Sequence, residues 1–239
     1  MGRLFHDVNG MVVDWQMWLD LLNSTQTVVT NPIVELTLVS FHWANIEHLL
    51  KRVLFMQKPF NLMKWITDND HVFKKPVMNK QFFKEADDVI VFVSKGPNTR
   101  NDYHVNPTEE LFYQLKGDIA LRVRPLDGTP PHDVVIREGE MFLLPRDVPH
   151  RPQRPAGTLG LIVEFPRPEG TQDQLRWYCP DDEHLVYQAE FRLQHIDEDL
   201  HKIMDDFWNG PIENRTCKET GKVVERAEQF DIDDAEEAS

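Results

Sequence analysis

Residues 96–117 read GPNTRNDYHVNPTEELFYQLKG, and the fold that we expect for the chain follows from them. Turn-forming Gly, Pro and Asn residues lead to a histidine, two adjacent glutamates and an apolar run that a second glycine closes. Residues 139–154 read GEMFLLPRDVPHRPQR and contain a glycine, an apolar run, a proline turn and a histidine, in that order. Short apolar runs between Gly and Pro turns are typical of antiparallel β-structure. Both stretches therefore predict strands, with a histidine beside turn residues near a strand end.

The same pattern continues on both sides of these stretches and predicts an all-β barrel or sandwich. The expected strands are residues 89–93, 111–115, 119–123, 134–136, 141–144 and 159–165. A short helix is expected over residues 62–67. Apolar residues at helical spacing predict two longer helices, over residues 43–56 and 193–208. The predicted fold class is mainly β, with α-helices that flank the barrel.

These patterns divide the chain of 239 residues into four parts. Residues 1–57 are an N-terminal extension that is partly helical, and residues 58–168 are the barrel. Residues 169–225 are a C-terminal region that contains a helix. Residues 226–239 are rich in Asp and Glu, so we expect a solvated, disordered tail.

Composition restricts the partners and the compartment. The formal net charge of −14 disfavours binding to nucleic acid and to anionic membranes. The start of the chain lacks the basic and apolar pattern of a signal peptide, and residues 33–56 carry too many charges for a membrane span. The two cysteines, Cys179 and Cys217, cannot form a dense disulfide framework. We therefore expect a cytoplasmic protein that binds neither nucleic acid nor a membrane.

Three residues of the two stretches are candidate metal ligands, namely His104, Glu110 and His150. Two imidazoles and one carboxylate occupy one face of an octahedral ion and leave three positions open, as in non-haem Fe(II) oxygenases. Imidazole also binds Zn, Ni and Cu, so the ligand types alone leave the metal open. Glu109 is adjacent to Glu110, and only one of them can share a strand face with His104. Even spacing from His104 favours Glu110, although a proline interrupts the strand between them.

Three charged residues suit the binding of a substrate. Arg100 precedes His104 by four residues, and Arg154 follows His150 by four. Guanidinium groups bind carboxylates through two parallel hydrogen bonds. Glu164 lies inside an apolar run, where it either faces solvent or needs a partner, because an unpaired buried carboxylate is costly. An aromatic acid with an ortho amine and hydroxyl would suit two arginines and one glutamate.

Both stretches resemble the two cupin motifs. The matching positions are Gly96, His104, Glu110 and Gly117 in the first motif, and Gly139, Pro145 and His150 in the second. Asp102 stands where many cupins have a further histidine, Asp147 replaces the usual glycine and Arg154 replaces the usual asparagine. With these departures, the region from about residue 58 to residue 208 closely resembles the 3-hydroxyanthranilate 3,4-dioxygenase family. The strings that carry this resemblance are residues 96–100, 102–104, 112–114, 139–145, 149–154 and 160–164.

The resemblance implies a cupin barrel, a jelly roll that is also described as a double-stranded β-helix. It implies Fe(II) as the cofactor, bound by the three candidate ligands named above. Arg154 is then assigned to the carboxylate of the substrate, and Glu164 to its amine or hydroxyl side. Arg100 is assigned to O2 and, together with Glu110, to catalysis.

The implied reaction is the Fe(II)- and O2-dependent ring opening of 3-hydroxyanthranilate to 2-amino-3-carboxymuconate semialdehyde. This product is the precursor of quinolinate in NAD biosynthesis from tryptophan, the kynurenine pathway. The expected partners are therefore a small aromatic substrate and O2. Single-barrel members of the family tend to form homodimers, so a homodimer is also expected.

Bacterial and fungal members of the family carry a second, rubredoxin-like iron site with two Cys-x-x-Cys pairs. Cys179 and Cys217 match the first cysteine of each pair, but Asp182 and Thr220 stand at the second positions. A site of four thiolates is therefore lost. We predict that Cys179 and Cys217 are remnants that lie close together, form no second metal site and bind no iron. His184 is expected to be a loop residue.

Two other functions remain open from the sequence. One is another metal-dependent cupin enzyme, such as an isomerase or a thiol dioxygenase, although Arg154 and Glu164 argue against a neutral sugar as its substrate. The other is a non-catalytic cupin that binds a small molecule. The lost iron site and the N-terminal extension favour a non-catalytic protein, whereas the intact set of metal and substrate candidates favours an enzyme.

Overall fold

The computed structural model describes most of the chain from residue 58 onward. The described residues are 5–6, 12–13, 58–73, 77–181, 184–196, 198–228 and 230. The chain divides into two compact units, Met1–Gln57 and Lys58–Ser239. In the first unit, β1 (Phe5–His6) pairs with β2 (Val12–Val13) in antiparallel fashion. The helix predicted over residues 43–56 and most of the acidic tail lie outside the described residues, so both stay predictions.

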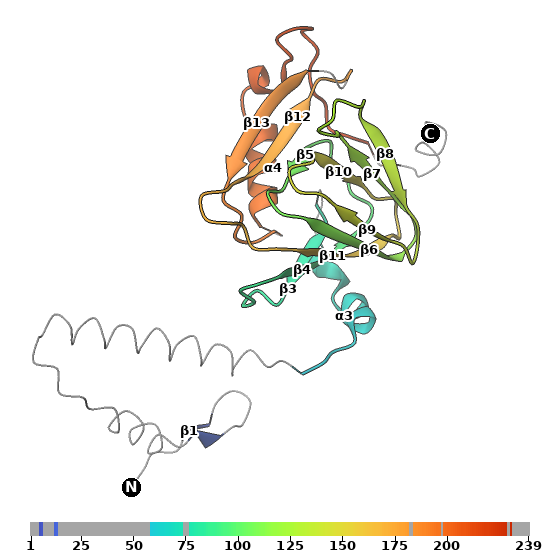
Figure 1. Cartoon of the computed structure of the whole chain (residues 1–239), viewed down its shortest axis with the longest axis vertical. Helices are drawn as coiled ribbons and strands as arrows, with labels where there is room; N and C mark the ends of the chain where they lie inside the picture. Colours follow the sequence, from blue (N-terminus) through green and yellow to red (C-terminus); the bar gives the residue numbers. More distant parts are fainter. Residues whose placement is uncertain are drawn as a thin grey trace, which may run out of the picture. The chain divides into compact units, whose positions relative to one another are not determined.

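The second unit contains two antiparallel sheets (Figure 1), which together form a jelly roll. In order across the first sheet, the strands are β13 (Leu185–Phe191), β12 (Asp173–Tyr178), β5 (Tyr103–Val105), β10 (His150–Gln153), β7 (Ile119–Val123) and β8 (His132–Ile136). In order across the second sheet, they are β3 (Asn79–Phe82), β4 (Ile90–Lys95), β11 (Leu159–Glu164), β6 (Glu110–Lys116) and β9 (Met141–Leu144). The mainly β fold class is therefore confirmed.

The predicted strands agree with the structure wherever an apolar run marks them. Strands β7 and β9 have the predicted bounds, and β4, β6, β8 and β11 differ from theirs by a few residues. Strands β3, β5, β10, β12 and β13 were not predicted, because they are short or carry polar side chains between the apolar ones. The strands β12 and β13 lie beyond residue 168 and yet extend the sheet that contains β5 and β10.

Three short helical segments and one longer helix complete the second unit. They are α3 (Leu62–Asp68), η1 (Asp70–Val72), α4 (Asp199–Asn209) and η2 (Ile212–Arg215). The helix α4 begins six residues later than the predicted start at residue 193, because the side chain of Asp199 accepts hydrogen bonds from the backbone N–H groups of Gln194 and His195 at 2.7 and 2.8 Å. These bonds hold the preceding residues in a turn.

The core lies between the two sheets and extends under α4. Phe112 and Ile162 from one sheet and Leu121 from the other belong to one buried cluster. The ring of Phe207 on α4 stacks on the ring of Trp177 on β12, with 4.0 Å between the ring centroids. This contact fixes the helix on the strands beside the mouth of the jelly roll.

Replacement of Phe207 by alanine is expected to destabilise the protein by about 3–5 kcal/mol, because it removes a large side chain that is fully buried. Urea unfolding followed by tryptophan fluorescence would measure the loss. The matched control is Ile212→Ala, since Ile212 is 48% exposed and its truncation should change stability by less than about 0.5 kcal/mol. Equal effects of the two substitutions would contradict the packing described here.

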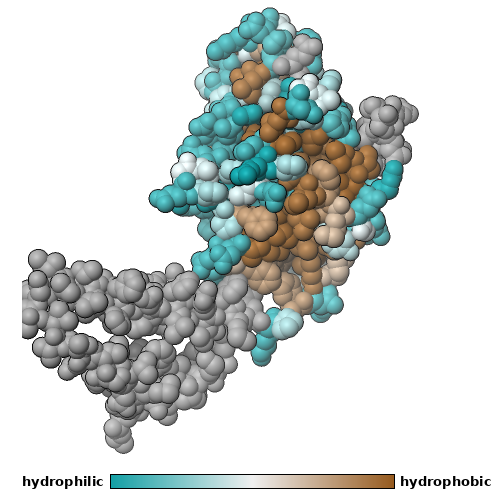
Figure 2. All heavy atoms as spheres, in the orientation of Figure 1, coloured by the Kyte–Doolittle hydropathy of each residue, from teal (hydrophilic) through white to brown (hydrophobic). Residues whose placement is uncertain are grey.

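The outer face of β9 exposes large apolar side chains. Met141 and Leu143 are 63% and 51% exposed, whereas Leu144 is buried. Figure 2 shows apolar residues gathered over one face of the second unit. Exposed apolar patches of this kind are common at protein–protein interfaces. Within the part of the chain that the structure describes, no helix has the length and the apolar content that a membrane crossing requires.

Candidate metal centre

Strand pairing brings the three candidate ligands together. His104 on β5 lies directly opposite His150 on β10, and Glu110 opens β6 in the facing sheet. One nitrogen of each histidine and one oxygen of Glu110 all lie within 4.8 Å of one another. The three side chains are buried, whereas Glu109 is exposed. The structure therefore places Glu110 rather than Glu109 with the histidines, as the even spacing predicted.

Hydrogen bonds fix the orientation of both imidazole rings. Nε2 of His104 lies 2.7 Å from Oδ2 of Asp173, and Nδ1 of His150 lies 3.1 Å from the carbonyl oxygen of Val148. Carbonyl oxygens and ionised carboxylate oxygens can only accept hydrogen bonds. The ring nitrogen that faces each of these oxygens therefore carries the proton. The other nitrogen of each ring is then available to a metal. Such outer hydrogen bonds accompany almost all histidine ligands in metal sites.

The electrostatics of the cluster suit a divalent cation. Burial lowers the pKa of His104 although Asp173 raises it, so this ring is neutral. Burial raises the pKa of Glu110, yet His150, His104 and Arg167 together bring that pKa below its usual value. Oε2 of Glu110 is buried and accepts no well-aligned hydrogen bond from the part of the chain that the structure describes, although Nε2 of His150 lies 3.1 Å away. A bound cation would satisfy this oxygen, so the residues fit a metal.

An arginine that the sequence patterns did not indicate connects the metal centre to Glu164. Nη2 of Arg167 donates to Oε2 of Glu164 at 2.6 Å and to Oδ2 of Asp173 at 2.7 Å, and Nε donates to Oδ1 of Asp173 at 2.7 Å. Burial lowers the pKa of Arg167, but the charges of Glu164 and Asp173 have the larger effect, so the pKa is raised above its usual value. Burial raises the pKa of Asp173, but His104 and Arg167 bring it below its usual value. Asp173 therefore stays charged and holds His104 in place.

Replacement of Asp173 by asparagine is expected to lower the affinity for a divalent metal about 10- to 100-fold, since the outer partner of a histidine ligand loses its charge. Competition with a coloured chelator would measure this affinity. The control is Asp133→Asn, because Asp133 pairs with Arg122 at 3.3 Å away from the metal cluster. Equal affinity in the Asp173 variant and the wild type would show that this carboxylate does not support the ligand.

Glu164 is fully buried, so its side chain does not face solvent. It lies opposite Glu110 in the pairing of β11 with β6. Burial and the charge of Glu110 raise the pKa of Glu164 to about 8, despite the opposing effect of Arg167. Its Oε1 atom is buried and has no hydrogen-bond partner among the described residues. This carboxyl group can therefore hold or release a proton near neutral pH.

Arg154 is almost completely buried and only partly paired. Its Nη1 donates to Oε1 of Gln114 at 3.2 Å, and its Nε has no hydrogen-bond partner among the described residues. Burial and the nearby charge of Arg100 lower the pKa of Arg154 to about 10, so it remains charged at neutral pH. A Cβ atom on Gly160 would come within 2.8 Å of Nη1, so the glycine leaves room for the guanidinium group. A buried cation of this kind calls for an anionic partner.

Arg100 is held by Asp102, which stands where many cupins have a further histidine. Asp102 accepts hydrogen bonds from Nη2 of Arg100 at 2.6 Å and from Nε at 3.2 Å. Both side chains are buried. The aspartate that replaces the usual histidine thus contributes no third imidazole to the cluster, and instead fixes the guanidinium group of Arg100.

One cavity is lined by all six residues that the sequence singled out. They are His104, Glu110, His150, Arg100, Arg154 and Glu164. Apolar walls come from Phe112 and Ile162, from Ile196 in the turn before α4 and from Leu200 in the first turn of α4. The open space between these side chains is about 20 Å³, which is room for an ion or a water molecule. The two histidines and Glu110 could hold a metal ion, and the buried arginines suit an anionic group beside it.

A jelly roll that holds two histidines and one glutamate, buried and around a common point, defines a metal-binding cupin. The sequence profile of the 3-hydroxyanthranilic acid dioxygenase family matches residues 54–208, and the chain belongs to this family.

Curated relatives and a solved structure resemble the chain. A 3-hydroxyanthranilate 3,4-dioxygenase of Yarrowia lipolytica is 44% identical over 171 residues, which cover 71% of this chain and 97% of the relative. The enzyme of the same name from a Jannaschia species is 46% identical over 165 residues, 69% of this chain and 89% of the relative. The crystal structure of a cupin-2 domain protein from Shewanella frigidimarina matches 43% of this chain and 92% of that chain, at 19% identity and a TM-score of 0.33.

Proposed function

We propose that the chain is a 3-hydroxyanthranilate 3,4-dioxygenase. It opens the ring of its substrate with both atoms of O2 and forms 2-amino-3-carboxymuconate semialdehyde, the precursor of quinolinate in NAD biosynthesis. The observation that carries this proposal is a cavity that is lined by three candidate metal ligands, two buried arginines and Glu164. Family membership supports it against another metal-dependent cupin enzyme and against a non-catalytic cupin.

We infer that the metal is Fe(II), held by His104, Glu110 and His150. Two imidazoles and one carboxylate with open positions are the ligand set that non-haem Fe(II) oxygenases use. Iron bound there supplies a Lewis acid and the transfer of electrons between substrate and O2. His150 has a raised pKa because Glu110 outweighs the effect of burial, and a metal cation takes the place of this proton.

The charged groups of the cavity orient the substrate and handle its protons. Arg154 is buried and charged with an unpartnered Nε, so it binds the substrate carboxylate. Glu164, whose pKa is raised to about 8, accepts or holds a proton at the amine or hydroxyl side. Arg100, fixed by Asp102, stabilises the negative charge that develops as O2 takes up electrons. The apolar walls exclude water from the ring.

The test is anaerobic loading with Fe(II), followed by addition of 3-hydroxyanthranilate and air. The semialdehyde is expected to appear as a rise in near-ultraviolet absorbance. Anthranilate, which lacks the hydroxyl group, and 3-hydroxybenzoate, which lacks the amine, should give no rise. A protein that binds one iron per chain at the cluster and opens none of these rings would point to another metal-dependent cupin enzyme.

We also propose a cytoplasmic homodimer that uses the outer face of β9. The exposed Met141 and Leu143 support this surface, because a second copy could cover them. Analytical ultracentrifugation of the Met141→Lys and Leu143→Lys variants would test the surface. Both variants should shift the protein toward monomer if the face is the dimer contact. An unchanged dimer would place the contact elsewhere.

A further inference from the structure

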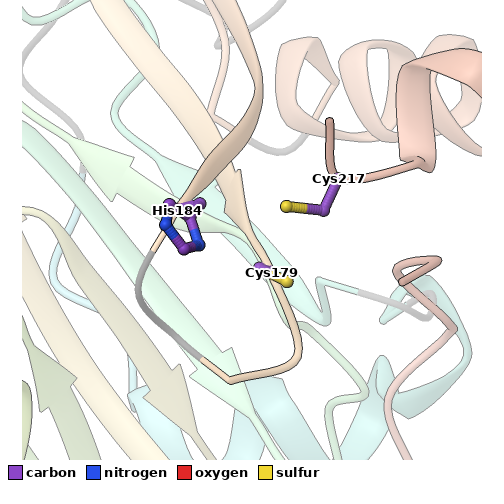
Figure 3. A group of neighbouring side chains, drawn as sticks. All are labelled: Cys179, His184 and Cys217. Carbon is purple, nitrogen blue, oxygen red and sulfur yellow. The ribbon is translucent and has the colours of Figure 1, made fainter. Parts of the chain in front are cut away.

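A second cluster of metal-binding side chains lies outside the cavity of the metal centre. Cys179 follows β12, His184 precedes β13 and Cys217 follows η2, and the three surround a common point (Figure 3). One ligand atom of each residue lies within 4.8 Å of the others. Both thiols are buried and neither forms a disulfide. The sequence predicts that the two cysteines lie close together, whereas it predicts only a loop position for His184.

One ring nitrogen of His184 has no hydrogen-bond partner. Its Nδ1 atom is buried and has no hydrogen-bond partner among the described residues. Buried polar atoms without a partner are rare in folded proteins, and a bound ion is one way in which such an atom is satisfied. A cation bound between the imidazole and the two thiols would satisfy this nitrogen if Nδ1 is the ligand atom, since one ring nitrogen lies within 4.8 Å of both sulfur atoms.

Two matched turns hold the thiols toward each other. The backbone N–H of Cys179 donates to the carbonyl oxygen of His184, and that of Cys217 donates to the carbonyl oxygen of Lys222, both at 2.8 Å. In both turns the acceptor lies five residues after the cysteine. A bridge between Thr216 and Val223 closes the second turn. The ligands are therefore positioned by backbone hydrogen bonds rather than by the cation itself.

We propose that Cys179, His184 and Cys217 form a zinc site. Zinc binds mixed sets of thiolates and imidazoles in tetrahedral geometry, whereas the rubredoxin-like iron sites of relatives need four thiolates. Three protein ligands leave the fourth position of a tetrahedral zinc ion to water, as in zinc sites that keep an open position. Asp181 pairs with Lys222 at 3.3 Å and is not among the ligand atoms that lie within 4.8 Å of one another. The proposed site differs from the prediction of no second metal site and agrees with the prediction that the two cysteines bind no iron.

Cobalt(II) is the probe that separates this site from the metal centre. Thiolate ligands give cobalt a strong charge-transfer absorbance in the near ultraviolet. The chain has only two cysteines, so this absorbance reports the proposed site and not the cluster of histidines and glutamate. Titration of the full chain under a phosphine reductant should give a band that saturates and disappears when zinc is added. A titration without this band would overturn the proposal.

Single substitutions identify the ligands. Cys217→Ser should abolish the band, and His184→Ala should weaken cobalt binding at this site at least 10-fold. The control is His132→Ala, because His132 is exposed on β8. Equal affinities of the two histidine variants would overturn the role of His184. Two iron atoms per chain after aerobic purification would overturn the choice of zinc.

Loss of the zinc site should not affect ring opening, since none of its residues lines the cavity of the metal centre. Cys179→Ser is expected to turn over 3-hydroxyanthranilate at the wild-type rate while it loses the cobalt band. The band and the turnover are independent readouts, so failure of the zinc site and failure of the proposed activity are distinguishable.

Discussion

Replacement of Glu110 by alanine is expected to lower the affinity for Fe(II) by more than about 100-fold and to abolish ring opening. The substitution removes the carboxylate from the cluster, which costs more than the loss of an outer partner of a ligand. It also leaves His104 and His150 without the negative charge that balances the metal. Metal analysis after dialysis and the semialdehyde absorbance at saturating substrate would measure both effects.

The neighbouring glutamate provides a matched control. Glu109→Ala removes the same carboxylate one position earlier, on an exposed side chain. This variant is expected to bind iron and to turn over substrate as the wild type does. If the Glu109 variant lost its iron and the Glu110 variant kept it, Glu109 rather than Glu110 would be the metal ligand.

Replacement of Arg154 by alanine is expected to raise the KM for 3-hydroxyanthranilate at least about 30-fold. The reason is that truncation of one partner of a buried, hydrogen-bonded charge pair typically costs about 2–5 kcal/mol. The KM should rise more than kcat falls, because Arg154 is assigned to binding and not to the reacting ring. Steady-state kinetics with excess iron would separate the two parameters.

Two comparisons sharpen this test. Arg146→Ala removes an exposed arginine from the turn before β10 and should leave the KM unchanged. A substrate analogue without the carboxylate should bind wild type and the Arg154 variant equally well. An unchanged KM in the Arg154 variant would remove its assigned role.

The candidate metal ligands could be predicted from the sequence because each stands in a short segment with its own turn signals. The turn before β10 illustrates the physical basis of such a signal. Asp147 has a φ of 64°, in the left-handed region that favours glycine, and aspartate is among the residues that tolerate it. This explains how Asp147 can replace the usual glycine while the turn keeps its shape.

The supporting residues could not be predicted in the same way. Asp173 reaches His104 only because β12 pairs with β5, and no local sequence pattern predicts that pairing. Arg167 follows Glu164 by three residues, so a partner for the buried glutamate was available in the sequence. The resemblance assigned Glu164 to the substrate, and this ion pair was not predicted. Strand β5 escaped prediction because it has three residues, one of them a buried histidine.

The position of β12 limits how far the chain can be truncated from its C-terminal end. A chain that stops after β11 would keep the two motifs and all three metal ligands. It would lose Asp173, which holds His104, and α4, whose first turn walls the cavity. Such a fragment would look complete to a motif search and would bind its metal weakly. The smallest piece able to act as an enzyme therefore extends well past the last cupin motif.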